Sequence, residues 1–528
     1  MSAHEPAGGV GSAGGAPRQA PATWWLPRAA REPWRGLPQR TLRVGAPGDT
    51  LSFTFPDPGR PEIEALLAHL SRAGDRLAHR PLADVLRSLD ALGHALADPG
   101  DARRAAALDL VAAATGRARA MCADSLDFLL SKLELRALAA AVRAAAAEPA
   151  CLSTVAAHPA GRRRRAVGPR LTVHLLAGNT PWAGAESLIA ALCARSASLV
   201  KLSSREPALA GLQAQALADV DPELAEAVAV VYWPRGAQVL EEVAFAEADA
   251  VVAFGDNDTV RGLAERLAWR SVSGRVLFVP RAHRTAVALV GTGARADHDT
   301  ARRTAEALAR DFALEDQEGC LSPHGAYVEA GGAGSAQGAA ATPGPAVSVD
   351  EFANLVAEAL AARERDWPRR LATAAEAAAV QQARGAAELR GARVLAPPGS
   401  TRWTVVVDPR PLFEPTPLGR YAWLKPVADL DAALAALLPA RGLLSTVGVA
   451  GLEGREADWI GKIAEALVPG RICPAGEMQR PPAGWNHDGA SDLAALLRWV
   501  EVEEPGEIPA EDSEFEELRA ILDELRDV

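Results

Sequence analysis

Between residues 171 and 279 the sequence alternates short apolar runs with helical patterns, and this alternation constrains the fold more than any other feature. Five runs are nearly continuous in apolar residues, as in strands that are buried on both faces: 171–176, 198–202, 227–233, 250–254 and 276–279. Helical spacing marks the segments between them: 186–194, 207–218, 238–246 and 258–267. Repeated units of this kind predict an α/β fold in which helices cover both faces of a parallel sheet. Ligands bind such sheets beyond the carboxyl ends of the strands.

Further patterns precede and follow this section. Before it, apolar residues recur at helical spacing between about residues 61 and 147, which predicts a helical N-terminal region. After it, a second section alternates in the same way. Its expected helices are 300–311, 350–365, 367–382, 430–438 and 458–466. Its expected strands are 326–329, 403–407, 421–424 and 444–449. The first 40 residues are rich in Gly, Ala and Pro, which predicts disorder there apart from docking of Trp24, Trp25 and Trp34.

The composition excludes several classes of protein. The chain has 528 residues and a net charge of −11, which argues against a nucleic-acid-binding protein because phosphate neutralisation needs a basic face. No stretch is long and apolar enough for a transmembrane helix, and the N-terminus lacks a secretion-signal pattern, so we expect a cytoplasmic protein. The five cysteines are scattered without a CxxC pair, which argues against a disulfide framework and against a zinc cluster. We therefore expect no metal site.

Cys320 is the cysteine whose surroundings best suit catalysis. It follows a predicted helix and Gly319, which allows close backbone approach, and it precedes the residues Leu-Ser-Pro. A cysteine on such a turn can present its sulfur to a cleft, where backbone N–H groups stabilise a developing oxyanion. The residues alone leave the alternative open that Cys320 is a small buried apolar side chain, as most cysteines are.

Four blocks, read in order, resemble the aldehyde dehydrogenase superfamily: 177–181 (AGNTP), 200–207 (VKLSSREP), 252–255 (VAFG) and 317–323 (QEGCLSP). Within that superfamily they are most similar to the LuxC-type acyl-CoA and acyl-protein thioester reductases of bacterial bioluminescence. Three later blocks look like the same family: 444–449, 485–489 and 497–500. The resemblance covers roughly residues 60 to 502.

The resemblance implies an aldehyde-dehydrogenase-like α/β fold. It implies a helical part at 41–165 that packs on the cofactor domain, a Rossmann-type NAD(P)-binding domain at 166–290, a catalytic α/β domain with the cysteine nucleophile at 291–470, and a segment at 471–502 that returns to the core. Composition adds the disordered extension at 1–40 and an acidic tail at 503–528. Relatives are usually dimers or tetramers, so a homo-oligomer is expected.

The resemblance makes Cys320 the nucleophile that takes up an acyl group. Asn179 matches the family's oxyanion-hole asparagine, whose amide would bond the substrate oxygen together with the Cys320 backbone N–H. From the residues alone, Asn179 equally suits a turn at a strand end. His487 with Asp488 would be a general acid–base pair, or else a structural contact that positions the C-terminal segment.

The resemblance also implies a nicotinamide cofactor. Lys201 matches the lysine that binds the adenosine ribose, and Ser203 lies in the turn that follows it. Three residues after this lysine, NAD-preferring relatives often carry a glutamate that would repel a 2′-phosphate. Here the position is Ser204, followed by Arg205, which favours NADPH over NADH.

Two further positions would touch this cofactor. Gly255, Asp256 and Asn257 match the turn after the next strand, where a helix N-terminus would face the pyrophosphate. The Gly-Ser pair that is usual in the dehydrogenases is not kept there. Glu414 falls where dehydrogenases hold the nicotinamide ribose with a glutamate, within a block that is poorly kept.

The segment 271–275 (SVSGR) is interpreted as a departure that bears on the reaction. Hydrolytic aldehyde dehydrogenases carry a Glu-Leu-Gly-Gly-Lys block there, and its glutamate activates the water that releases the acid. The absence of a glutamate from this segment favours reduction of an acyl thioester to an aldehyde over oxidation of an aldehyde. By the resemblance, the acyl group would be a fatty acyl group from acyl-CoA or from a protein, with an acyl-protein synthetase or a carrier protein as partner.

Two alternatives stay open. The protein could be another enzyme of the superfamily, which reduces an acyl phosphate or oxidises aldehydes. It could also be a non-catalytic subunit that binds an acyl carrier through its acidic tail and its early tryptophans.

Overall fold

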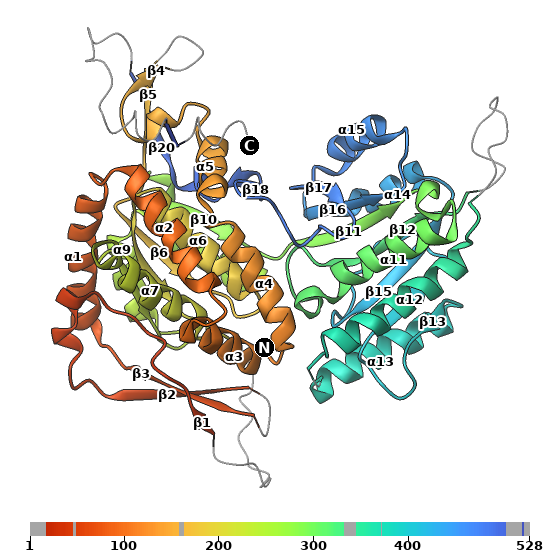
Figure 1. Ribbon diagram of the computed structural model, residues 1–528, viewed down its shortest axis with the longest axis horizontal. Helices are drawn as coiled ribbons and strands as arrows, with labels where there is room; N and C mark the ends of the chain where they lie inside the picture. Colours follow the sequence, from red (N-terminus) through yellow and green to blue (C-terminus); the bar gives the residue numbers. More distant parts are fainter. Residues whose placement is uncertain are drawn as a thin grey trace.

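The computed structural model describes residues 17–45, 49–157, 163–331, 345–370, 372–502 and 520–521. Figure 1 shows two lobes side by side, each built on a sheet with helices on its faces. The first half of the chain forms the lobe with the five-stranded sheet, and most of the second half forms the lobe with the seven-stranded sheet. The expected α/β fold with two sheets is confirmed.

The first sheet has the strand order β10-β9-β6-β7-β8, and every neighbouring pair is parallel. The apolar alternation predicts nine of its elements: β6 (Leu171–Leu175), α6 (Pro181–Cys193), β7 (Ala197–Lys201), α7 (Leu209–Val220), β8 (Val228–Val231), α9 (Gln238–Glu247), β9 (Ala250–Phe254), α10 (Asn257–Val272) and β10 (Leu277–Arg281). The short helix α8 (Pro222–Ala225) was not predicted. The strand order reverses between β6 and β9. A crevice opens beyond the carboxyl ends of the strands at such a switch.

Helices of the N-terminal region cover this first lobe (Figure 1). They are α1 (Arg60–Leu77), α2 (Leu82–Ala97), α3 (Ala102–Thr115), α4 (Arg119–Ser131) and α5 (Leu135–Ala145). Before them, β1 (Arg18–Gln19), β2 (Gln39–Val44) and β3 (Leu51–Pro56) form a small sheet of their own. The helices expected between about residues 61 and 147 are therefore confirmed, whereas β2 and β3 in the expected helical part 41–165 were not predicted.

Residues 17–40 are ordered, so the disorder predicted from their composition is wrong there, whereas the expected docking of Trp25 and Trp34 is confirmed. Trp25 exchanges two backbone hydrogen bonds of 2.9 and 2.8 Å with Val230 on the edge strand β8, and Leu26 and Trp34 are buried. Pairing with a sheet edge and burial of these side chains outweigh the chain entropy that a Gly/Ala/Pro-rich segment would otherwise keep. The remainder of the expected extension, residues 1–16, lies outside the described residues.

The second sheet has the order β13-β14-β15-β12-β11-β16-β17, in which β13 alone is antiparallel to its neighbour. Its elements are β11 (Thr285–Val290), α11 (His298–Ala313), β12 (Pro323–Glu329), α12 (Val349–Asp366), α13 (Ala374–Leu389), β13 (Arg393–Leu395), β14 (Thr404–Val407), β15 (Tyr421–Val427), α14 (Leu430–Leu437), β16 (Leu444–Ala450), α15 (Glu456–Leu467) and β17 (Ile472–Pro474). Alternate residues of a strand face opposite sides. Ala286 and Ala288 accordingly belong to the core under α11 and α12, and Val287 and Leu289 to the core under α13, α14 and α15.

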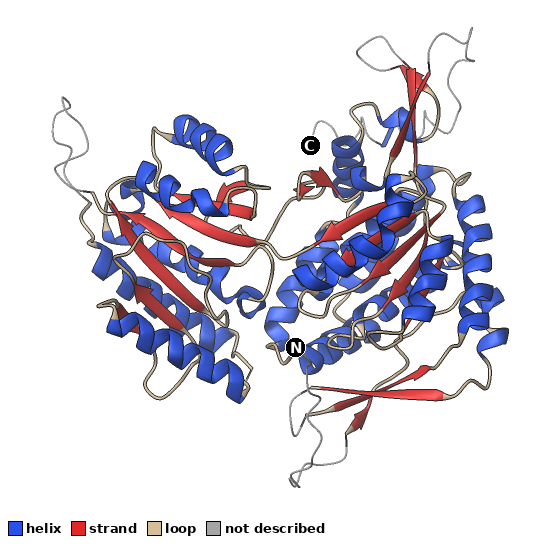
Figure 2. Cartoon of the chain, turned by 180° about the vertical axis from the view of Figure 1, so that it is seen from behind, coloured by secondary structure: helices blue, strands red, loops and turns tan. Residues whose placement is uncertain are grey.

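The chain passes between the lobes at two places near the crevice. β11 follows β10 directly but belongs to the second sheet, so the domain boundary expected at residue 290 lies one strand too late. After β17, a loop crosses back (Figure 2) and leads to β18 (Asn486–His487), β19 (Ala490–Ser491) and β20 (Arg498–Val502). β20 pairs with β5 (Arg163–Val167), which also pairs with β4 (Ala156–Ala157).

The expected acidic tail at 503–528 lies outside the described residues, apart from 520–521. Among the helices in the described part of the chain, none has the length and apolar character needed to cross a membrane.

Candidate active site

Cys320 lies on the loop between α11 and β12, and the backbone before it follows an unusual path. Three consecutive residues, Glu315, Asp316 and Gln317, have positive φ angles of 56°, 52° and 66°. Non-glycine residues in this left-handed region cost roughly 1–2 kcal/mol each, because Cβ comes too close to the following carbonyl oxygen. The surrounding structure must therefore hold the turn, and all three side chains are buried.

Asp316 and Gln317 tie the turn to the start of β15. The fully buried Arg420 donates two hydrogen bonds to Asp316, at 3.0 and 2.7 Å. The Gln317 amide donates to the backbone oxygens of Pro323 and Tyr421 at 2.7 and 2.9 Å, and it accepts from the Tyr421 N–H at 2.8 Å. These bonds fix the turn on the side of the second lobe.

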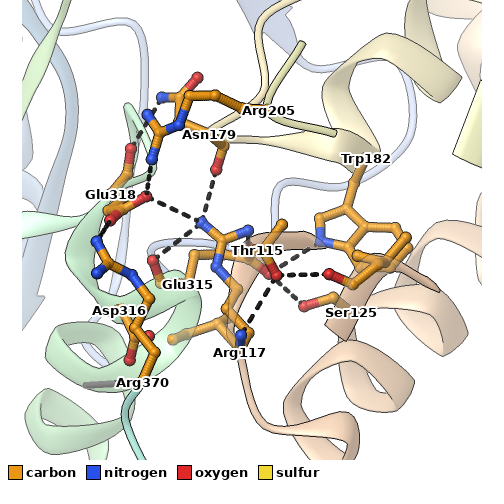
Figure 3. A network of polar contacts seen from close by, with 12 residues as sticks. Thr115, Arg117, Ser125, Asn179, Trp182, Arg205, Glu315, Asp316, Glu318 and Arg370 are labelled. Carbon is orange, nitrogen blue, oxygen red and sulfur yellow. Dashed lines mark hydrogen bonds and ion pairs between the residues drawn. The ribbon is translucent and has the colours of Figure 1, made fainter. Parts of the chain in front are cut away.

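Glu315 anchors the same turn to the first lobe (Figure 3). Its carboxylate accepts hydrogen bonds from Ser125 Oγ at 2.5 Å and from Trp182 Nε1 at 2.9 Å, and it pairs with Arg117 at 2.6 Å. Arg117 lies between α3 and α4, and only 3% of its side chain is exposed. Burial lowers the pKa of Arg117, but the carboxylates of Glu315 and Glu318 outweigh burial and raise it, so the guanidinium stays charged.

Arg117 also joins Asn179 to the Cys320 loop. Its guanidinium donates to the backbone oxygens of Asn179 at 2.6 Å and of Glu315 at 3.3 Å. Asn179 follows β6, and its side-chain amide donates to the Glu318 backbone oxygen at 3.0 Å. Asn179 and Cys320 line the same cleft. The structure thus brings together the two residues expected to stabilise an oxyanion, and that role of Asn179 stays a prediction.

His487 lies beside Cys320 and is held by a carboxylate other than the expected one. Its Nδ1 is 3.4 Å from Asp492, whereas its Nε2 is 4.0 Å from Asp488. Asp488 occupies the turn between β18 and β19 and pairs with Arg284 at 3.1 Å. His487 is therefore closer to Asp492 than to Asp488, the partner expected from the sequence.

The electrostatics of this pair give His487 a proton at neutral pH. Burial lowers the pKa of His487, but hydrogen bonds with Asp492 and Cys320 outweigh burial and raise the pKa to about 9. Burial raises the pKa of Asp492, but His487 and Arg281 lower it to about 2. Arg281 donates to Asp492 at 2.5 Å and to the His487 backbone oxygen at 2.8 Å. The imidazolium can therefore stabilise a cysteine thiolate and give a proton to a leaving group.

Cys320 lies where two cavities meet. The smaller has a volume of about 90 Å³, and its wall is largely formed by apolar side chains: Phe128, Trp182, Leu314, Leu321 and Trp485. The larger has a volume of about 760 Å³ and runs along the carboxyl ends of β6, β7 and β9. Gly319, Cys320 and His487 line both cavities. Two ligands can thus approach the sulfur from different sides.

The larger cavity contains most of the residues expected to bind the cofactor: Lys201, Ser203, Ser204, Arg205, Gly255 and Asp256. Lys201 ends β7, and burial there lowers its pKa. Asp256 caps α10 by accepting from the Thr259 N–H at 2.7 Å. Arg205 reaches across the cavity and donates to Glu318 at 3.4 Å.

Two expected cofactor residues are not among the described residues that line this cavity. The Asn257 side chain accepts a hydrogen bond from the His283 N–H at 3.0 Å. Glu414 pairs with Arg410 at 2.9 Å, and the cavity is bordered nearby by 417–419. The expected contact of Glu414 with a ribose in this cavity is therefore not supported by its position.

Residues 77–499, which include the Cys320 loop and both sheets, match the family described as acyl-CoA reductase (LuxC). The chain belongs to this family. Long-chain acyl-protein thioester reductase 2 of Photobacterium leiognathi is 25% identical over 346 residues, which cover 65% of this chain and 66% of the relative. The Vibrio harveyi long-chain acyl-protein thioester reductase is 29% identical over 160 residues, 30% of this chain and 31% of the relative. Both matches span less than two thirds of the relative's own length.

Solved aldehyde dehydrogenases share the fold of this LuxC-family protein. Aldehyde dehydrogenase 21 from Physcomitrella patens has a TM-score of 0.66 at 13% identity, covering 92% of this chain and 98% of that structure. Lactaldehyde dehydrogenase from Escherichia coli has a TM-score of 0.64 at 18% identity, covering 92% and 99%. The aldehyde-dehydrogenase-like fold expected from the sequence is confirmed.

The segment 271–275 is not among the described residues that line the cleft. It forms the end of α10 and the turn after it, and Val272 is 82% exposed. The cleft is bordered instead by 281–284, which contains no carboxylate. The absence of a glutamate from 271–275 therefore does not distinguish reduction of a thioester from oxidation of an aldehyde.

Sequence reasoning missed Arg117 and Asp492. No local signal marks Arg117 among the many arginines of the chain, since its partners lie far away in the sequence. Asp492 had a signal: the Asp488-Gly489 dipeptide, with φ angles of 57° and 102°, is typical of a two-residue hairpin turn. Such a turn folds the following residues back beside His487.

Proposed function

We propose that the protein reduces an acyl thioester to the aldehyde, with NADPH as the hydride donor and Cys320 as the residue that carries the acyl group. The observation that carries this proposal is the position of Cys320 at the junction of a small apolar cavity and a large polar one. The first suits an acyl chain, and the second has the size of a small-molecule site. Membership of the acyl-CoA reductase family supports the same reaction. The acyl donor would be acyl-CoA or an acyl group on a partner protein.

The larger cavity has side chains that suit a phosphorylated dinucleotide. Lys201 and Arg235 line it, and Ser204 stands where a carboxylate would repel a 2′-phosphate. Arg235 donates a hydrogen bond to Thr259 at 2.6 Å beside the N-terminus of α10. We therefore assign to Arg235 the contact with the 2′-phosphate for which the sequence suggested Arg205. NADPH bound there would supply the hydride.

Cys320, His487 and Asn179 would carry out the sulfur and proton chemistry. The Cys320 thiolate attacks the thioester carbonyl, and the Asn179 amide and the Cys320 N–H hold the oxyanion. The departing thiolate takes the proton of the His487 imidazolium, which leaves the acyl group on Cys320. After hydride transfer the second oxyanion collapses, the aldehyde leaves, Cys320 regains its thiolate and His487 takes a proton from solvent.

The carboxylates beside Cys320 are poorly suited to activating water. Glu315 is held by Arg117, and Glu318 pairs with Arg370 at 3.2 Å. A carboxylate held by an arginine in this way must give up that contact before it can bind and orient a water molecule. An acyl group on Cys320 would therefore persist until hydride reaches it.

Intact-mass spectrometry tests this proposal. Incubation with an acyl-CoA should add one acyl mass, and NADPH should remove that mass with release of aldehyde. Cys320→Ala should lose the adduct, whereas Cys473→Ala should keep it, because Cys473 is buried and burial raises its pKa to about 11. Absence of the adduct from the wild-type protein would refute the proposal. Acid formed from aldehyde, without reduction of acyl-CoA, would instead favour an aldehyde dehydrogenase.

A further inference from the structure

A second apolar cavity lies behind the small cavity at Cys320. Its volume is about 70 Å³, and α5, α6 and the loop before β18 form its walls. Its apolar lining includes Leu138, Ile189, Ala190, Cys193 and Leu493. Three residues line both this far cavity and the near cavity at Cys320, and they form the wall between the two: Glu186, Trp485 and Asp492.

Trp485 is the apolar member of this wall, and the other two are held by ion pairs. Glu186 pairs with Lys132 at 2.7 Å, and Asp492 is bound by Arg281 at 2.5 Å. A polar group that is already paired resists displacement by an acyl chain, because its partner would be left unpaired. The part of the wall that an apolar chain meets is therefore the indole of Trp485.

The position of this indole is set from two sides. Its ring stacks on His487, with centroids 4.9 Å apart and planes at 20°. The preceding Gly484 has a φ of +75°, and a Cβ placed there would lie 2.8 Å from the Ala141 Cα on α5. The loop backbone is thus packed against α5, which keeps the indole between the two cavities.

We propose that Trp485 sets the length of the acyl chain that the site accepts, by closing the near cavity against the far one. This inference rests on the proposed function and names its substrate range. A cavity of about 150 Å³ holds one benzene ring of six carbons, so the far cavity has room for about three carbons. A chain that reaches Trp485 stops there, and removal of the indole lets it continue by that amount.

The test is a chain-length series of saturated acyl-CoA substrates, with kcat/KM measured for the wild type, Trp485→Phe and Trp485→Ala. Loss of the stacking on His487 slows every substrate alike, so the readout is the ratio between long and short chains. Each methylene that gains an apolar site improves binding by about fourfold. We expect Trp485→Ala to move the optimum by about three carbons and to raise the long-to-short ratio by roughly 50-fold. Trp485→Phe should move it less, in the same direction. An unchanged optimum in both variants would overturn the inference.

Refilling the far cavity provides the matched control. Ala190 lines that cavity and not the near one, so Ala190→Leu in the Trp485→Ala background should return the optimum towards that of the wild type. The same substitution in the wild-type background should leave the optimum unchanged. A gain in chain length that survives Ala190→Leu would show that the longer chain takes another path, which would also overturn the inference.

Labelling of Cys320 separates this inference from the proposed function. Alkyl methanethiosulfonates form a mixed disulfide with a thiolate and release methanesulfinate, so they probe the cavity without any reduction step. Their labelling rates should depend on chain length in the wild type and shift by the same number of carbons in Trp485→Ala. If that shift appears while no acyl-CoA is reduced, the proposed function fails and the role of Trp485 stands. If acyl-CoA is reduced but the labelling rates show no shift, the proposed function stands and the role of Trp485 fails.

Discussion

Replacing Arg117 with methionine removes the buried guanidinium that joins the two lobes in Figure 3 and keeps much of the side-chain volume. Glu315 would lose its partner at 2.6 Å and stay buried, with Ser125 and Trp182 as its remaining donors. Breaking a buried pair in this way costs about 3–5 kcal/mol. The Asn179 backbone oxygen would also lose its donor at 2.6 Å, which adds about 1 kcal/mol. We therefore expect Arg117→Met to lower the free energy of unfolding by about 4–6 kcal/mol.

The matched control is Arg119→Met, at the first residue of α4. Arg119 pairs with Asp109 at 2.6 Å, but these side chains are 55% and 61% exposed, and such a surface pair contributes at most about 1 kcal/mol. The two variants are compared by the shift in the midpoint of urea denaturation and by the rate at which acyl-CoA acylates Cys320. Because Arg117 places both Asn179 and the Cys320 loop, we expect its replacement to slow acylation by about 100-fold. Arg119→Met should leave that rate nearly unchanged.

A double variant completes the design. Glu315→Gln combined with Arg117→Met removes both charges, so it should recover part of the lost stability, because no buried carboxylate is left without its partner. Equal midpoint shifts for Arg117→Met and Arg119→Met would refute the reasoning about the buried pair. A wild-type acylation rate in Arg117→Met would show that Asn179 and Cys320 keep their places without it.

Two further predictions concern protons and the cofactor. The pKa of His487 is raised from 6.5 to about 9, so the stability it contributes is fully present below about pH 6.5 and is lost as the pH rises through about 9. The rate of Cys320 acylation, plotted against pH, should fall over the same range around pH 9. Asp492→Asn should move this fall towards neutral pH, and a fall that stays at the same pH would exclude Asp492 as its cause. Arg235→Ala should raise KM for NADPH by about tenfold with little change in KM for NADH, and an equal rise for both cofactors would exclude contact with a 2′-phosphate.

Much of the first sheet could be predicted from the sequence, because strands buried on both faces leave continuous apolar runs. β11 is just as apolar, yet it escaped prediction. Three residues, 282–284, separate it from β10, which is too short for the crossover helix that joins parallel strands of one sheet. The two strands belong to different sheets, and alternation of strands with helices cannot reveal such a change.

The boundary of α13 shows a second limit. The sequence predicts a helix from residue 367, but α13 starts at Ala374, after a capping box in which Thr373 and Glu376 bond each other's backbone N–H groups. The proline at residue 368 and this Thr-x-x-Glu pattern are both local signals, and alanine-rich surroundings obscured them.

The candidate site could be predicted only in part. Cys320, Asn179 and Lys201 stand in ordered blocks next to strand ends, and the structure brings them to one cleft. The pairs that hold the site join distant parts of the chain: Arg117 lies 198 residues from Glu315. Charges alone do not specify such a pairing, because the sequence offers many arginines for each buried carboxylate.

The left-handed turn before Cys320 has a consequence for the order of folding. The contacts that hold it span 190 residues from Ser125 to Glu315 and 104 residues from Asp316 to Arg420. Contacts of such separation form late, because closing a long loop costs chain entropy before the contact is gained. Until both lobes are complete, nothing offsets the strain in the turn. A newly made chain should therefore carry Cys320 on a relaxed loop, and Cys320 should reach its place in the cleft only at the last stage of folding.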